Sequence, residues 1–202
     1  MVSQERAERT RGRLLQAAAR EFSLHGYSGT SLQRISRSAG VTLGALTFHF
    51  PTKPALAGAV HAQGFAVTLE AVAQTGADHT VDEDDREYPL LQRVMRISHT
   101  VAALLYEEPT VRAAARLSRE QAPGLDDWND SWLPEVRRLL DQASHEKQLR
   151  TGVDPDIVTL LLRYLVLGML DSTQPPETAA SHLPQLTAVW DVLLPGLVNG
   201  GL

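Results

Sequence analysis

Hydrophobic residues recur at helical spacing along this chain, and no segment shows the alternation of a half-buried strand. The first predicted helix runs from Arg6 to Leu24, and Gly26 is well placed to end it. Its apolar positions fall on one face: Leu14, Leu15, Ala18 and Phe22. The pattern predicts an all-α fold.

Two short helices and one long helix are predicted next. Thr30 and Gln33 form a T-x-x-Q capping box for a two-turn helix that ends near Ala39 and Gly40. Thr42 caps a second short helix that continues to Phe48, and Pro51 prevents it from going further. A longer helix is predicted from residue 52 to residue 74.

Further helices are predicted over residues 89–106, 109–119, 127–148, 155–170 and 183–198, with acidic or Pro- and Gly-containing loops at 75–87 and 121–126. The segment 157–170 is apolar around nearly its whole circumference, so both of its sides must be covered. It is shorter than the roughly 20 residues of a membrane span and contains Arg163. We therefore expect no membrane insertion, and we expect segments 157–170 and 183–198 to form a homodimer interface about a two-fold axis.

Composition and charge narrow the function classes. The chain has no cysteine, which excludes disulfides, cysteine-ligated metal and thiol catalysis and fits a cytoplasmic protein. Residues 1–55 contain eight Lys or Arg and three Glu, a net charge of +5, so the remainder of a chain of net charge −5 carries −10. A basic amino-terminal quarter on an acidic body predicts a nucleic-acid-binding head, and chance clustering of charge on a solvated helix face is the alternative.

Residues 30–50 have the layout of a helix-turn-helix, the alternative being an ordinary helical hairpin. In this layout Thr42, Leu43, Gly44 and Thr47 face outward, where a recognition helix meets base edges in the major groove. Basic side chains that flank the motif are placed to reach phosphates: Arg34, Arg37 and Lys53. We include Thr30 and Ser31 among the predicted DNA-binding residues, and His49 as a phosphate-facing or capping residue.

The stretch GVTLGALTFHFPTKPAL resembles the most characteristic segment of the TetR (tetracycline repressor) family of bacterial transcription regulators. The resemblance is close over residues 9–57 and implies a helix-turn-helix DNA-binding domain at 1–54 and a helical effector-binding and dimerisation domain at 55–202. It implies a repressor of a palindromic DNA operator that a small apolar ligand releases. Within the family the chain is similar to the γ-butyrolactone receptors that control antibiotic production. A regulator that senses a drug or an acyl metabolite is the alternative.

Two residues depart from the family pattern. Leu43 stands where the butyrolactone subgroup usually has Lys, and Thr47 stands where most members have Tyr. Both changes remove groups expected to touch phosphate, which weakens the sequence-independent part of DNA affinity. Leu43 is instead suited to contact a thymine methyl group.

The resemblance also implies an effector pocket in the carboxy-terminal helices. Trp128 is a candidate wall of that pocket, with core packing as the alternative. Apolar candidates for its lining are Leu91, Met95, Val101, Leu165 and Met169. No catalytic motif is present and the seven His residues lack metal-ligand spacing, so we expect no metal, no cofactor and no enzyme, with an all-α enzyme acting on a lipid-like substrate as the remote alternative.

Overall fold

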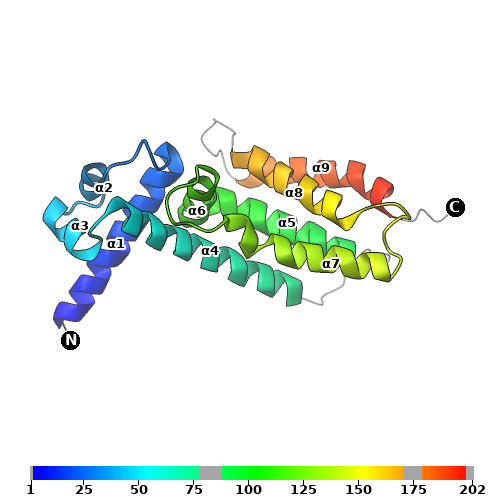
Figure 1. Ribbon diagram of the computed structural model, residues 1–202, viewed down its shortest axis with the longest axis horizontal. Helices are drawn as coiled ribbons and strands as arrows, with labels where there is room; N and C mark the ends of the chain where they lie inside the picture. Colours follow the sequence, from blue (N-terminus) through cyan, green and yellow to red (C-terminus); the bar gives the residue numbers. More distant parts are fainter. Residues whose placement is uncertain (1, 78–87, 171–178, 199–202) are drawn as a thin grey trace. The chain divides into compact units, whose positions relative to one another are not determined.

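The computed structural model describes residues 2–77, 88–170 and 179–198 (Figure 1). Within these ranges β pairing is limited to one isolated bridge, between Leu149 and Val198. The predicted all-α fold is confirmed. The elements are α1 (Val2–His25), α2 (Leu32–Ser38), α3 (Leu43–His49), α4 (Lys53–Ala77), α5 (Pro89–Glu107), α6 (Pro109–Arg119), the 3₁₀ helix η2 (Trp128–Ser131), α7 (Leu133–His145), α8 (Pro155–Leu170) and α9 (Ala179–Leu197).

The chain packs as two compact units. Unit 1 comprises residues 1–67 and 108–128, and unit 2 comprises residues 68–107 and 129–202. By packing, therefore, α6 belongs to the same unit as α1, α2 and α3, although it is distant from them in sequence. The predicted boundary between residues 54 and 55 divides the chain by role, and that division stays a prediction.

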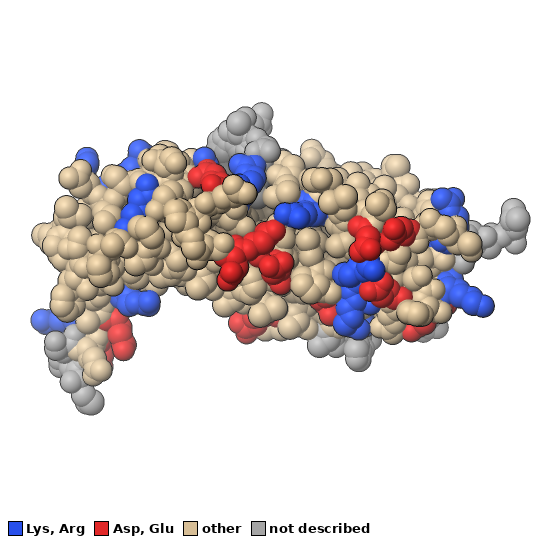
Figure 2. Space-filling model, viewed as in Figure 1, with Lys and Arg blue, Asp and Glu red and all other residues tan. Residues whose placement is uncertain are grey.

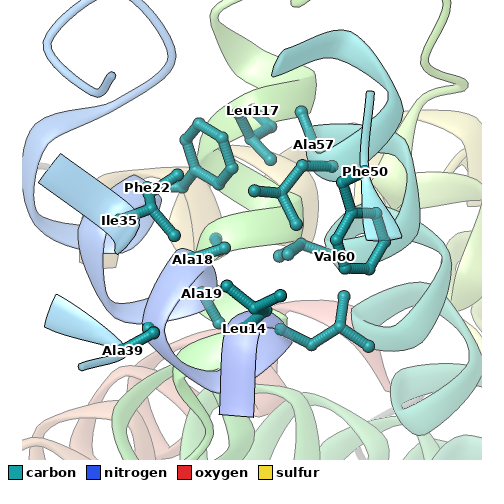
Figure 3. Close-up of a cluster of buried hydrophobic side chains, with 14 of the residues drawn as sticks. Leu14, Ala18, Ala19, Phe22, Ile35, Ala39, Phe50, Ala57, Val60 and Leu117 are labelled. Atoms are coloured by element: carbon teal, nitrogen blue, oxygen red, sulfur yellow. The ribbon is translucent and has the colours of Figure 1, made fainter. Parts of the chain in front are cut away.

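The core of unit 1 is built from the inward faces of α1, α2, α3, α4 and α6. Figure 3 shows Phe22 of α1, Ile35 of α2 and Leu117 of α6 in one cluster of buried side chains. Leu46 fixes α3 to this cluster and is fully buried. These apolar positions are the ones that hold the two short helices in place, since helices of seven residues are not stable alone.

The helix α4 approaches α6 closely within unit 1. A Cβ atom at Gly64 would lie 2.3 Å from the carbonyl oxygen of Thr110, so only glycine allows this packing distance. By length and composition alone, residues 53–76 meet the criteria for a membrane span. Leu56 and Val60 of the same helix are fully buried in the unit 1 core, as in the core helix of a folded domain.

Unit 2 is organised around α5, which packs against α7, α8 and α9. Its buried face carries Val94, Ile97 and Val101, at the spacing of one helical stripe. The indole N–H of Trp190 donates to the hydroxyl of Ser98 at 2.9 Å, so a buried polar pair fixes α9 on α5.

The predictions for segments 127–148 and 75–87 differ from the structure. The helix predicted over 127–148 is interrupted: η2 comes first and α7 begins only at Leu133. Pro134 explains the break, because a proline lacks the N–H of a helix interior and is tolerated in the first turn. The loop predicted over 75–87 begins later, since α4 extends to Ala77, and its remainder at 78–87 lies outside the described residues.

Candidate nucleic-acid interface

The helices α2 and α3 form the predicted helix-turn-helix. The chain turns between them at Gly40, whose φ of +64° favours glycine. Thr42 caps α3 as predicted, because its side chain accepts a hydrogen bond from the backbone N–H of Ala45 at 3.1 Å. Arg13 of α1 donates to the carbonyl of Ala39 at 2.8 Å and so fixes the turn from outside the motif.

One face of α3 is open to solvent. The predicted base-facing residues Thr42, Leu43, Gly44 and Thr47 are all exposed. A Cβ at Gly44 would meet no atom within 4 Å, and the Thr47 hydroxyl donates to the carbonyl of Gly44 at 3.2 Å. The structure therefore brings these four residues together on one accessible surface, which we call the α3 face. That they contact DNA stays a prediction.

The prediction from the sequence missed Phe48, which follows Thr47 in α3 and is a fifth exposed residue of the α3 face. Its side chain is 81% exposed, the highest value among the exposed large hydrophobic residues. It contacts the half-buried ring of His49 edge-on, with ring centroids 5.3 Å apart. The signal was present in the sequence: the two Phe residues of the F-H-F motif are two positions apart, so they point to different sides of a helix and only one of them reaches the core.

Two of the three predicted phosphate-binding cations, Arg34 and Lys53, differ in their surroundings. Arg34 is held by α1, since its Nε lies 2.6 Å from a carboxylate oxygen of Glu21 and its Nη2 donates to His25 at 2.7 Å. The ammonium of Lys53 lies 4.2 Å from the centre of the Tyr27 ring. An ion pair compensates a charge whereas an aromatic ring does not, so Lys53 retains the stronger field toward an anion.

The structure corrects two predictions for Thr30, that it binds DNA and that it caps α2. Its side chain is only 2% exposed and donates to the carbonyl of Glu21 at 3.1 Å, so it is not accessible to DNA. The cap of α2 is instead Ser31, which is exposed and accepts from the backbone N–H of Arg34 at 3.2 Å. Either residue type is suited to cap a helix, and the contact with Glu21, nine residues away, decides between them.

Charge on unit 1 is consistent with a polyanion partner. In Figure 2 blue side chains predominate over the region of α1, α2 and α3, with few red ones among them. Unit 1 contains Lys53 and Arg37, and Arg11 lies over the ring of Phe50 with its guanidinium carbon 5.3 Å from the centroid. An uncharged and partly apolar face surrounded by cations is the arrangement that reads bases while the flanks bind phosphates.

Comparison with known proteins identifies the family to which the chain belongs. Residues 14–60 match the family described as bacterial regulatory proteins, tetR family. The HTH-type transcriptional repressor AcnR of Corynebacterium diphtheriae is 33% identical over 178 residues, which cover 84% of each chain. The chain belongs to the TetR family. The resemblance predicted from the sequence is confirmed, and so is the class of helix-turn-helix transcription repressor.

Other proteins similar to this chain include two receptors and a TetR family protein solved with DNA. The A-factor receptor protein of Streptomyces griseus is 28% identical over 206 residues, covering 100% of this chain and 68% of the relative. A crystal structure of a γ-butyrolactone receptor (ArpA-like protein) superposes with a TM-score of 0.76 at 29% identity, over 96% of this chain and 90% of that one. The CprB protein of Streptomyces coelicolor, solved with its operator sequence, gives a TM-score of 0.72 at 28% identity over 95% and 90% of the two chains.

The residues predicted to line an effector pocket are divided between the units. Trp128 lies in unit 1 and is fully enclosed, with 1% of its surface exposed. In unit 2, Leu91 and Val101 are fully buried whereas Met95 and Leu165 are half-buried. The side chain of Met169 lies outside the described residues. The ligand-binding role of all six stays a prediction.

Proposed function

We propose that this TetR family protein represses transcription in the cytoplasm by binding a palindromic DNA operator as a homodimer, and that a γ-butyrolactone-type ligand releases it. The observation that carries the DNA-binding part is the α3 face, with its exposed Leu43 and Phe48 held on a buried scaffold and flanked by cations. The likeness to the γ-butyrolactone receptor structure supports the ligand class. We propose a regulator and not an enzyme on the same grounds.

The roles divide as the sequence suggested. We assign DNA binding to residues 1–54 and effector binding and dimerisation to residues 55–202. Segment 109–128 also supports the DNA-binding head, because α6 is part of the same compact unit as α1, α2 and α3.

The proposed dimer surface lies on α8 and α9. Ile157, Leu160 and Tyr164 are exposed at helical spacing on α8, and Val192 is 79% exposed on α9. A stripe of large apolar side chains in water is unfavourable, and a second copy of the same surface covers it in an isologous contact.

The experiment is a titration of the purified protein against labelled DNA from the region upstream of its own gene, which we expect to contain the palindrome. Binding should weaken steeply as salt rises and should be reversed by a synthetic γ-butyrolactone. Scrambling one half-site should remove the specific part of the affinity. Binding to no upstream DNA above the level for random sequence would contradict the repressor proposal, and operator binding that no γ-butyrolactone reverses would contradict the ligand assignment.

A further inference from the structure

The helix α3 offers few groups that can form hydrogen bonds with a base. Its sequence, LGALTFH, contains no Arg, Lys, Asn, Gln, Asp or Glu, the residue types whose side chains read the hydrogen-bonding pattern of bases. Its one ionisable residue, His49, is half-buried and packs edge-on against Phe48. Recognition of bases by α3 therefore depends on its threonines and on its apolar side chains.

The two threonine hydroxyls of the α3 face already have partners inside the motif. The Thr42 hydroxyl accepts from the backbone N–H of Ala45 at 3.1 Å. The Thr47 hydroxyl donates to the carbonyl of Gly44 at 3.2 Å, so only its lone pairs are left for a base. A single hydroxyl cannot form the paired bonds that distinguish guanine from adenine. The threonines hold the shape of the helix, and base specificity falls to the apolar side chains.

Leu43 and Phe48 are the large apolar side chains of the α3 face, and they are 40% and 81% exposed. Five positions on an α-helix separate them by roughly 7.5 Å along the axis and about 140° around it. Between them lies Gly44, where a Cβ would meet no atom within 4 Å. Since successive bases are about 3.4 Å apart along one strand, the two side chains reach different base pairs.

The charge around α3 selects DNA as the molecule that covers this face. Residues 22–69 contain three basic residues and no Asp or Glu: Arg34, Arg37 and Lys53. Even with Glu21, the ion-pair partner of Arg34, the charge of this stretch stays positive. An apolar face in a positively charged setting suits a groove whose two edges are lined by phosphates. The apolar side chains then lie against the base edges at the floor of that groove.

The major groove presents one methyl group among its polar atoms, at C5 of thymine. An apolar side chain that removes the polar atoms from water without a hydrogen bond destabilises the complex, whereas contact with the methyl group stabilises it. We propose that Leu43 and Phe48 set operator specificity by each packing against the methyl group of a thymine. This inference rests on the proposed repressor function and adds the base that each half-site presents to α3.

The test replaces thymine by deoxyuridine, which lacks the C5 methyl group and keeps the same hydrogen-bonding groups. The operator found in the upstream DNA is synthesised with deoxyuridine at every thymine of both half-sites, and a second probe carries it only outside them. Affinity of the full-length protein should fall by about four-fold for each contacted methyl group, the factor that one buried methyl supports. The first probe should therefore bind at least about ten-fold more weakly than the unmodified operator, and the second should bind equally well.

Variants assign the effect to the two side chains. Leu43→Ala and Phe48→Ala should each remove part of the difference between the thymine and deoxyuridine operators, and the double variant should remove all of it. Lys53→Ala is the matched control, because a lost phosphate contact weakens binding to both operators and leaves their ratio unchanged. Thermal unfolding shows that each variant folds. If the double variant binds too weakly to measure, the ratios of the single variants carry the test.

The outcomes separate this inference from the proposed function. Equal binding of both operators by the wild type overturns the inference and leaves the repressor proposal standing. A difference that persists undiminished in both single variants overturns it too, because the methyl groups then act through the DNA itself. Specific binding to no upstream DNA overturns the repressor proposal and this inference together.

Discussion

The backbone N–H of Tyr27 donates to the carboxylate of Glu120 at 2.7 Å, which joins two residues 93 positions apart. Arg116 reinforces the contact, since it donates to Glu120 at 2.9 Å and to the carbonyl of Ser23 at 3.0 Å. The last turn of α6 is thereby fastened to the end of α1. The DNA-binding head is therefore completed by a segment far outside the first 54 residues.

Gly26 lies at the centre of this contact, and Gly26→Ala should destabilise the fold. The φ of Gly26 is +68°, and a Cβ there would lie 2.2 Å from Oε1 of Glu120. The strained backbone and the displaced carboxylate should together lower the free energy of unfolding by about 1–3 kcal/mol. Urea denaturation of the variant beside the wild type measures the change.

Gly12→Ala is the matched control for this prediction. Gly12 lies inside α1, and a Cβ there would meet no atom within 4 Å. The substitution should stabilise the helix by about 0.5–1 kcal/mol. Equal stability of Gly26→Ala and the wild type would mean that Glu120 does not constrain the turn.

The two phenylalanines of the F-H-F motif should have opposite roles. Phe48→Ala should leave stability within about 0.5 kcal/mol of the wild type, because the ring is exposed, and should weaken operator binding. Phe50 is 4% exposed in the unit 1 core, so Phe50→Ala should cost about 3–5 kcal/mol of unfolding free energy. Denaturation and fluorescence anisotropy with operator DNA separate the two effects. Undiminished operator affinity in folded Phe48→Ala would remove this residue from the α3 face.

The features of this site that the sequence predicts are those made by residues close together along the chain. The Thr42 cap and the Gly40 turn are local, so spacing alone predicts them correctly. The burial of Thr30 and the clamp of Arg13 on Ala39 depend on α1, which folds back on the motif from a distance in sequence. The hydrogen bond between Tyr27 and Glu120 joins residues 93 positions apart, so no local sequence pattern could predict it.

The prediction of one continuous helix over residues 127–148 was wrong for a related reason. Apolar spacing continues through Trp128, Trp132 and Val136, and periodicity cannot register that the backbone changes from 3₁₀ to α between them. Trp132, with φ of −142°, is the residue at which the break occurs. The proline two positions later was the available signal for a helix start.

Arg34 and Lys53 should differ in their contribution to salt dependence, although position alone predicts equal effects. Lys53→Ala should reduce the slope of log affinity against log salt by about one, as expected for one lost phosphate contact. Arg34→Ala should reduce it by less, because Glu21 already compensates the guanidinium at 2.6 Å. Glu21→Gln should release Arg34 and steepen the slope. If Arg34→Ala reduces this slope by a full unit, DNA displaces Glu21 from Arg34 on binding.

His61 of α4 is buried, which predicts a pH dependence of stability. Burial holds the pKa of His61 below its ordinary value, so the unfolded chain binds the proton more readily than the folded chain. The free energy of unfolding therefore rises with pH up to about 6.5, the ordinary pKa of histidine, and falls as pH drops below it. In His61→Phe this part of the dependence should be absent. Urea denaturation at pH 7.5 and 5.5 should show that the free energy of unfolding falls less in the variant than in the wild type at the lower pH. An equal fall in both proteins would mean that His61 does not titrate in this range.

The exposed stripe of α8 predicts that the oligomer depends on single side chains. Tyr164 is 61% exposed at the carboxy-terminal end of this stripe, so Tyr164→Asp would place a carboxylate on each side of a two-fold contact, where it is desolvated beside its own copy. We expect light scattering to give twice 22.1 kDa for the wild type and 22.1 kDa for the variant. Leu24→Asp is the control, because Leu24 is equally exposed but lies on α1, and it should stay dimeric. The monomeric variant should also lose operator affinity, since two heads joined by a two-fold axis read half-sites about 34–36 Å apart or a multiple of that distance. A wild-type mass of 22.1 kDa would instead leave the α8 stripe without a partner and would contradict the dimer.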